Sequence, residues 1–118
     1  MKNCTVYKTM NIMGKRWTIH ILLELHKGDK KEKGFNELKR KLGGVTPRIL
    51  SARLVELESE GLIIKQTDHS KVPGRSEYFL TESGEDFIQV IQGIKKWGTK
   101  WKFKNSECDR SVCKYCDL

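Results

Sequence analysis

Residues 46–63, with the sequence TPRILSARLVELESEGLI, predict a capped amphipathic helix that is followed at once by a strand. Thr46 is a favourable N-cap, and Pro47 suits the first helical position because the N–H that proline lacks would be unpaired there. Gly61 follows the last turn, where glycine commonly ends a helix. The fold must therefore accommodate a short, well-delimited helix that leads directly into a strand.

The two sides of this helix differ in character. At about 100° per residue, one side holds Leu50, Leu54 and Leu57, with Ile49 beside them. The opposite side is small, short and weakly charged, and it consists of Arg48, Ser51, Ala52 and Val55. Such a side suits a helix that enters a groove, although an ordinary surface helix of a small bundle would also accept it.

Length and charge narrow the class of protein. The chain has 118 residues, enough for one domain with a modest core, and its formal net charge of +8 attracts polyanions such as nucleic acid. No run approaches the roughly 20 apolar residues of a membrane span, and residues 1–10 lack the apolar core of a signal peptide. We therefore expect a cytoplasmic protein without a membrane partner.

Three helices are expected before residue 46, over 5–13, 17–25 and 34–42. The second, WTIHILLEL, is the most apolar stretch and the expected buried helix. The polar run 29–33 reads as a loop between glycines, and Gly43 and Gly44 form the turn before the capped helix. A helix, a glycine-containing turn and a second capped helix match the helix-turn-helix signature.

Two strands and a long helix are expected after residue 61. The strands are residues 62–67 and 76–80, and the turn-rich loop 68–75 between them suits an exposed ribbon. Thr81 caps the last helix, whose apolar residues recur every three or four positions: Phe87, Val90, Ile91, Ile94, Trp97 and Trp101. We expect a mainly α protein with a two-stranded β wing (α+β), comprising a domain over 4–102 and a cysteine-containing tail over 103–118.

Several short motifs occur in the order of one known family. They are Cys4 at the start of the first helix, GKRWT at 14–18, FNEL at 35–38, TPRILS at 46–51, LVEL at 54–57, PGR at 73–75 and LTESG at 80–84. Together they resemble the HxlR-type transcriptional regulators, relatives of the MarR group, from about Cys4 to Trp101. The tail is the part of the chain that departs from this pattern.

The resemblance implies a winged helix-turn-helix that dimerises through its terminal helices. It implies a cytosolic transcriptional regulator that binds a pseudo-palindromic operator in double-stranded DNA as a homodimer, with no required cofactor. Regulators of this type often respond to oxidants, electrophiles or small metabolites. The apolar stripe over 87–101, with the first helix, is more apolar surface than one winged helix needs, which also favours a dimer.

The helix over 46–60 is the expected recognition helix in the major groove. Arg48 is the candidate for a guanine contact because its fork matches O6 and N7. Ser51 suits a base or a phosphate, and Ala52 and Val55 suit a thymine methyl group. The expected DNA-binding residues of this helix are Thr46, Pro47, Arg48, Ser51, Ala52, Arg53 and Val55.

Further basic residues are candidates for phosphate contacts. Arg53 lies nearer the flank of the helix, where it would bind phosphate or instead form an i,i+3 ion pair with Glu56. Lys15 and Arg16 precede the buried helix, and Lys39 lies on the third helix. In the wing, the candidates for backbone phosphate or a narrow minor groove are His69, Ser70, Lys71 and Arg75. A solvated loop is the alternative for the wing.

Cys4 occupies a position where the HxlR-type family often carries a redox-sensing thiol. Lys2 and Lys8 nearby would favour its thiolate form. The alternative is a small buried residue in the dimer core. In the reducing cytosol, its thiol and those of the tail are better explained as redox groups or metal ligands than as structural disulfides.

The tail cysteines Cys108, Cys113 and Cys116 follow the spacing C-x4-C-x2-C. This spacing occurs in plant-type iron–sulfur ligation, and four thiolates would also suit zinc if Cys4 joined them. Redox chemistry, a metal or cluster, and inert thiols all remain open for the tail.

Two other functions compete with DNA binding. A redox enzyme could use Cys113 and Cys116, but such a motif normally begins a helix in a βαβ context, whereas here it lies in a polar tail. A winged helix that binds only proteins would not need a basic wing or the outward Arg48. The sequence shows neither a hydrolase constellation nor a phosphate loop, so we expect a protein that is not an enzyme.

Overall fold

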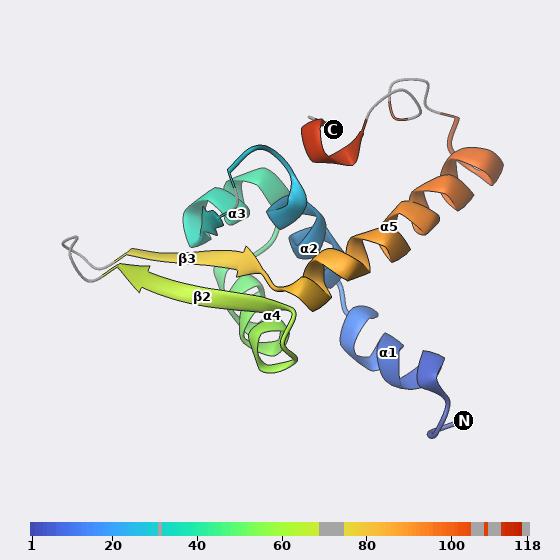
Figure 1. Ribbon diagram of the computed structural model, residues 1–118, viewed down its shortest axis with the longest axis horizontal. Helices are drawn as coiled ribbons and strands as arrows, with labels where there is room; N and C mark the ends of the chain where they lie inside the picture. Colours follow the sequence, from blue (N-terminus) through green and yellow to red (C-terminus); the bar gives the residue numbers. More distant parts are fainter. Residues whose placement is uncertain (31, 69–74, 105–107, 109–111, 117–118) are drawn as a thin grey trace.

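The computed structural model describes residues 1–30, 32–68, 75–104, 108 and 112–116 (Figure 1). In chain order the elements are α1 (Thr5–Met13), α2 (Thr18–His26), β1 (Glu32–Gly34), α3 (Phe35–Leu42), α4 (Pro47–Ser59), β2 (Ile63–Asp68), β3 (Arg75–Leu80), α5 (Glu82–Trp101) and the short 3-10 helix η1 (Cys113–Tyr115). The α+β class with a mainly helical chain is therefore confirmed. Within the described ranges, no helix is long and apolar enough to cross a membrane.

The helix expected from residue 46 is α4, and its ends are those that the sequence predicted. The Oγ1 atom of Thr46 accepts a hydrogen bond from the Ile49 N–H at 3.2 Å, and Pro47 is in the first turn. Gly61 follows with φ +80°, a left-handed conformation that glycine adopts without steric cost. The side of α4 that faces the core consists of Leu50, Leu54 and Leu57.

The core is centred on α2. Ile21 and Leu22 are fully buried, and Leu25 is 3% exposed, which confirms the most apolar stretch as the central helix. Around α2 pack the leucine side of α4, the start of α5 and residues of α3 and the sheet. This arrangement holds α3 and α4 as one unit on the same core.

The wing is the antiparallel hairpin of β2 and β3, in which Ile63 lies opposite Leu80. It extends away from α1 and from the far end of α5 (Figure 1). β1 pairs with the other edge of β3, so the sheet has three strands in the order β1-β3-β2. The expected two-stranded wing is thus part of a three-stranded sheet. The prediction of a loop over 29–33 was wrong at Glu32 and Lys33, which lie in β1.

The contacts of Lys33 show how this charged residue is accommodated in β1. The residue is only 5% exposed, and its Nζ donates to the carbonyl oxygens of Glu24 at 2.6 Å and Lys27 at 2.7 Å. These carbonyls end α2, where cations are favoured because helix-terminal C=O groups lack partners. Burial lowers the pKa of the Lys33 ammonium, and the charge of Glu24 opposes that shift. The pairing of β1 with β3, which joins segments far apart in sequence and has no periodic signal, converts the polar run into a strand.

Thr81 joins the end of α4 to the start of α5. Its Oγ1 accepts the Gly84 N–H at 3.2 Å as the N-cap of α5, and donates to the Gly61 carbonyl at 2.6 Å. Its backbone N–H donates to the Leu62 carbonyl at 3.0 Å. The far half of α5 extends beyond the rest of the fold (Figure 1), so this junction sets the direction in which the long helix leaves the core.

Two glycines of α5 provide a matched test of this junction. A Cβ at Gly84 would overlap the Leu62 carbonyl, so Gly84→Ala should lower the free energy of unfolding by about 1–3 kcal/mol. A Cβ at Gly93 would meet nothing within 4 Å, so Gly93→Ala should raise that free energy by up to about 1 kcal/mol. Urea unfolding followed by circular dichroism at one protein concentration measures both. Equal effects would contradict the tight packing of α5 on the Leu62 carbonyl, just before β2.

Candidate nucleic-acid interface

The outward face of α4 is exposed, as the sequence predicted. We define this face as Arg48, Ser51, Ala52 and Val55, all of which are exposed. Val55 is 65% exposed although it is apolar. The opposite side of α4 is at most 2% exposed at its three leucines, so the helix cannot rotate without uncovering them. The outward face is therefore presented in one fixed orientation.

The turn between α3 and α4 packs against Trp17. Gly43 and Gly44 have φ of +56° and +114°, and a Cβ at Gly44 would lie 3.8 Å from Cη2 of the Trp17 ring. Trp17 itself has φ +80°, the one positive value among the described non-glycine residues, and it is the N-cap of α2. A bulky residue rarely adopts this conformation. The strained backbone at Trp17 places its ring beside the Gly43–Gly44 turn that leads into α4.

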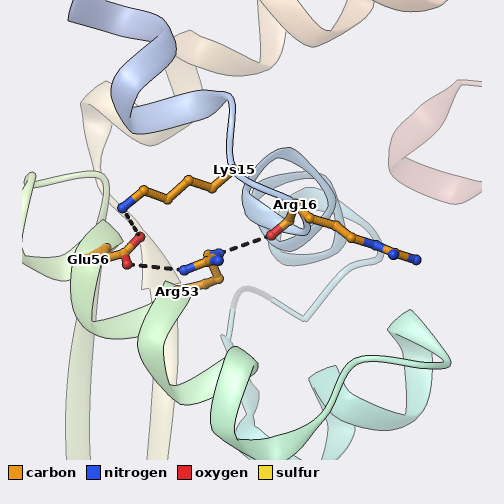
Figure 2. A network of polar contacts seen from close by, with 4 residues as sticks. All are labelled: Lys15, Arg16, Arg53 and Glu56. Carbon is orange, nitrogen blue, oxygen red and sulfur yellow. Dashed lines mark hydrogen bonds and ion pairs between the residues drawn. The ribbon is translucent and has the colours of Figure 1, made fainter.

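A network of polar contacts joins α4 to the segment before α2 (Figure 2). Glu56 Oε1 lies 3.1 Å from Arg53 Nη1, and Glu56 Oε2 lies 3.3 Å from Lys15 Nζ. Arg53 Nε–H also donates to the Arg16 carbonyl oxygen at 3.0 Å. The i,i+3 ion pair considered from the sequence as the alternative for Arg53 is therefore present, and Lys15 shares the same carboxylate.

The other candidates on the helices are exposed. The Arg16 guanidinium points away from the Glu56 carboxylate (Figure 2), and its carbon lies 5.2 Å from the centroid of the Trp17 ring. That distance suits a cation–π contact, which orients the side chain. Lys39 is exposed on α3. Thr46 and Pro47 are exposed at the start of α4, where the Thr46 oxygen is occupied by its capping bond.

The wing candidates belong to the sequence between β2 and the start of β3. His69, Ser70 and Lys71 lie outside the described residues, and only the backbone of Arg75 is described. Their role in DNA binding stays a prediction. The described part of the hairpin adds Lys65, an exposed cation on β2 that the sequence analysis did not single out. Its position in a strand next to a basic loop was the signal that could have identified it.

Large apolar side chains are exposed on both terminal helices. On α1, Val6 is 69% and Met10 is 51% exposed. On α5, the exposed members of the stripe are Val90, Ile94, Trp97 and Trp101, at 51–64%. Of that expected stripe, Ile91 is buried at 5% exposed, whereas Phe87 is partly buried against the core. The periodic pattern therefore covers two adjoining faces, one in the core and one in solvent.

The cysteines are divided between the two ends of the chain. Cys4 is exposed at the start of α1, and the described tail lies near the end of α2 instead (Figure 1). The tail is held there by the Gly28 N–H, which donates to the Lys114 carbonyl at 2.5 Å, and by Cys113 Sγ, which lies 3.7 Å from Gln92 Oε1. Cys4 and the tail thiols do not meet within one chain.

The arrangement of the described cysteines bears on the metal site considered from the tail spacing. No group of three or more His, Cys, Asp or Glu residues that could hold an ion occurs among the residues described. Neither the zinc site nor the iron–sulfur cluster considered from the tail spacing is supported by this arrangement.

Helix α3, its glycine turn, helix α4 and the β2–β3 hairpin define a winged helix-turn-helix protein. The model of the HxlR-like helix-turn-helix family matches residues 12–106, and the chain belongs to that family. It is a transcriptional regulator with a helix-turn-helix DNA-binding domain.

Relatives and solved structures agree with this assignment. The uncharacterized HTH-type transcriptional regulator YvaP of Bacillus subtilis (strain 168) is 36% identical over 94 residues, which are 80% of this chain and 83% of YvaP. A MarR-family regulator of Porphyromonas gingivalis W83 has a structure with TM-score 0.76 and 33% identity, over 86% of this chain and 95% of its own. The reduced form of the redox regulator HypR gives TM-score 0.69 and 33% identity, over 82% of this chain and 92% of HypR.

Proposed function

We propose that this regulator acts in the cytoplasm as a homodimer that reads a pseudo-palindromic operator, with one α4 in each of two successive major grooves. The supporting observation is the outward face of α4, which is exposed over its whole length and held by a buried leucine side. Two copies related by a two-fold axis would place their recognition helices about 34 Å apart, one turn of DNA.

Within this proposal the residues divide into two groups. Arg48 reads guanine, Ser51 donates to a base or phosphate, and Ala52 and Val55 contact thymine methyl groups. The remaining contacts position the protein on phosphate and carry no sequence information. They come from the exposed Arg16 and Lys39 and from the wing residues His69, Ser70, Lys71 and Arg75.

Arg48→Ala tests the base-reading role. On a duplex selected from a random pool by the wild-type protein, the variant should bind about 5- to 150-fold more weakly, because one bidentate guanine contact contributes about 1–3 kcal/mol. On random-sequence duplex the loss should be much smaller. Lys39→Ala is the control, because losing a phosphate contact weakens both complexes alike. Fluorescence anisotropy measures both, and equal losses for Arg48→Ala would contradict the assignment.

The dimer is proposed from the exposed apolar side chains of α1 and α5. Exposed Trp97 and Trp101 lie on the same side of α5 as Val90 and Ile94, so they form one surface rather than scattered residues. Contiguous exposed apolar surface of this kind typically marks a protein–protein interface. A second copy is the occupant proposed, because a symmetric operator requires a symmetric protein.

Trp97→Glu should convert the dimer to a monomer, because it places a charge in the apolar interface. Gln89→Glu is the matched control, since it adds the same charge to an exposed position on another side of α5. Light scattering after size-exclusion chromatography at micromolar concentration measures the mass. A wild-type monomer, or a dimer that survives Trp97→Glu, would rule out this interface.

We further propose that Cys4 makes the regulator responsive to oxidants. The thiol is exposed at the start of α1, one of the two proposed dimer helices. Attack of its thiolate on hydrogen peroxide gives a sulfenic acid, while the peroxide is reduced to water. A change of this size and polarity beside the interface would alter the spacing of the two recognition helices.

Peroxide treatment should therefore change operator affinity several-fold in the wild-type protein and leave Cys4→Ser unaffected. Cys113→Ser should retain the response, because the tail lies apart from α1. Anisotropy before and after treatment gives the affinities, and intact mass spectrometry detects the added oxygen. A response that survives Cys4→Ser but disappears in Cys113→Ser would transfer the sensor to the tail.

A further inference from the structure

Glu56 lies between Lys15 and Arg53, two basic side chains that the sequence predicts to bind DNA. Its two oxygens take different partners, Arg53 at 3.1 Å and Lys15 at 3.3 Å. Figure 2 shows both cations directed toward this carboxylate. The Arg53 side chain is 20% exposed, Lys15 is 49% exposed and Glu56 is 37% exposed. The carboxylate therefore holds two positive charges at the edge of the recognition helix.

The same contacts connect two segments that are distant in sequence. Lys15 precedes α2, whereas Arg53 and Glu56 lie on α4. The second anchor, Arg53 Nε–H to the Arg16 carbonyl, spans 37 residues. With both anchors in place, Arg53 cannot extend toward a phosphate without giving up an ion pair and a hydrogen bond. Arg16, by contrast, keeps its guanidinium outside the network (Figure 2).

We infer that Glu56 withholds Lys15 and Arg53 from phosphate and thereby limits the sequence-independent affinity of the protein for DNA. This inference rests on DNA binding through α4, as proposed above. Phosphate contacts strengthen binding to every sequence alike and carry no sequence information. Two further cations on the DNA backbone would therefore strengthen complexes with every sequence alike. The carboxylate thus limits the affinity for any duplex, so that a larger share of the binding free energy depends on base contacts.

Glu56→Gln tests this role because it keeps the shape of the side chain and removes the charge that holds the two cations. Exposed ion pairs contribute little to folding, so the variant is expected to fold. Glu60→Gln is the matched control. It removes the same charge from the end of the same helix, and among the described residues Glu60 forms no ion pair.

The measurement is the affinity of the full-length protein for a random-sequence duplex over a range of salt concentrations. The slope of log affinity against log salt counts the phosphates neutralised, at roughly 0.9 for each. Glu56→Gln should steepen this slope by about 0.9 to 1.8, for one or two released cations. Glu60→Gln should leave it unchanged. The ratio of affinities for selected and random duplex should stay the same in both variants, because phosphate contacts carry no sequence information.

Lys15→Gln adds a test that does not depend on the first variant. In the wild-type protein Lys15 is held by Glu56, so its removal should not change the salt slope. In the Glu56→Gln background the same substitution should reduce the slope by about 0.9, because there Lys15 binds phosphate. An effect of Lys15→Gln that is present only in the Glu56→Gln background shows that Glu56 keeps Lys15 from phosphate. A general change in net charge would act in both backgrounds.

The outcomes separate this inference from the proposed function. Equal slopes for Glu56→Gln and Glu60→Gln would overturn the inference, while selective binding by the wild-type protein would leave α4 as the reader. A shallower salt slope for Lys15→Gln in the wild-type background would also overturn the inference. This measurement tests the inference even if Glu56→Gln fails to fold. Wild-type protein that binds no duplex would overturn both the inference and the proposed function.

Discussion

Three leucines on one side of α4 pack into the core, and their burial decides which residues of that helix face solvent. Burying each such side chain stabilises the fold by about 1.5–3 kcal/mol, so rotating α4 by even one residue would be costly. Arg48 and the rest of the outward face hold their direction because Leu50, Leu54 and Leu57 hold theirs. The same burial places the α3–α4 turn against Trp17 and brings Glu56 within reach of Lys15. The local polar contacts refine an orientation that the apolar side has already set.

The junction at Thr81 carries this orientation to the other end of the molecule. The Thr81 hydroxyl binds the Gly61 carbonyl that follows α4 and caps α5, and Ser83 Oγ donates to the same carbonyl at 3.2 Å. Gly84 keeps the distance short, because any side chain there would meet the Leu62 carbonyl. The exposed apolar surface on α5 therefore has a fixed relation to the outward face of α4. In the proposed dimer, the spacing of the two recognition helices would follow directly from how the α5 helices pack.

Features set by neighbouring residues were predictable from the sequence, and features set by distant contacts were not. The Thr46 cap, the leucine side of α4 and the stop at Gly61 all depend on residues within a few turns. β1 was missed because its pairing with β3 joins segments far apart in sequence. Of the two ion pairs of Glu56, only one could be predicted from the sequence. The pair with Arg53 has helical i,i+3 spacing, whereas Lys15 is distant in sequence. The period of the apolar residues predicted helix α5. It did not show which of those residues are buried in the core and which face solvent.

The net charge predicts attraction to DNA, but it does not show which basic side chains contact the DNA. The chain carries a formal charge of +8, which would draw it to any duplex. Yet Lys33 is buried against the end of α2, and Lys15 and Arg53 share one carboxylate. Each of these charges adds to the long-range field while its side chain is engaged within the protein. A regulator built this way would be attracted to DNA by its overall charge and still depend on a few exposed residues, Arg48 first among them, to distinguish one sequence from another.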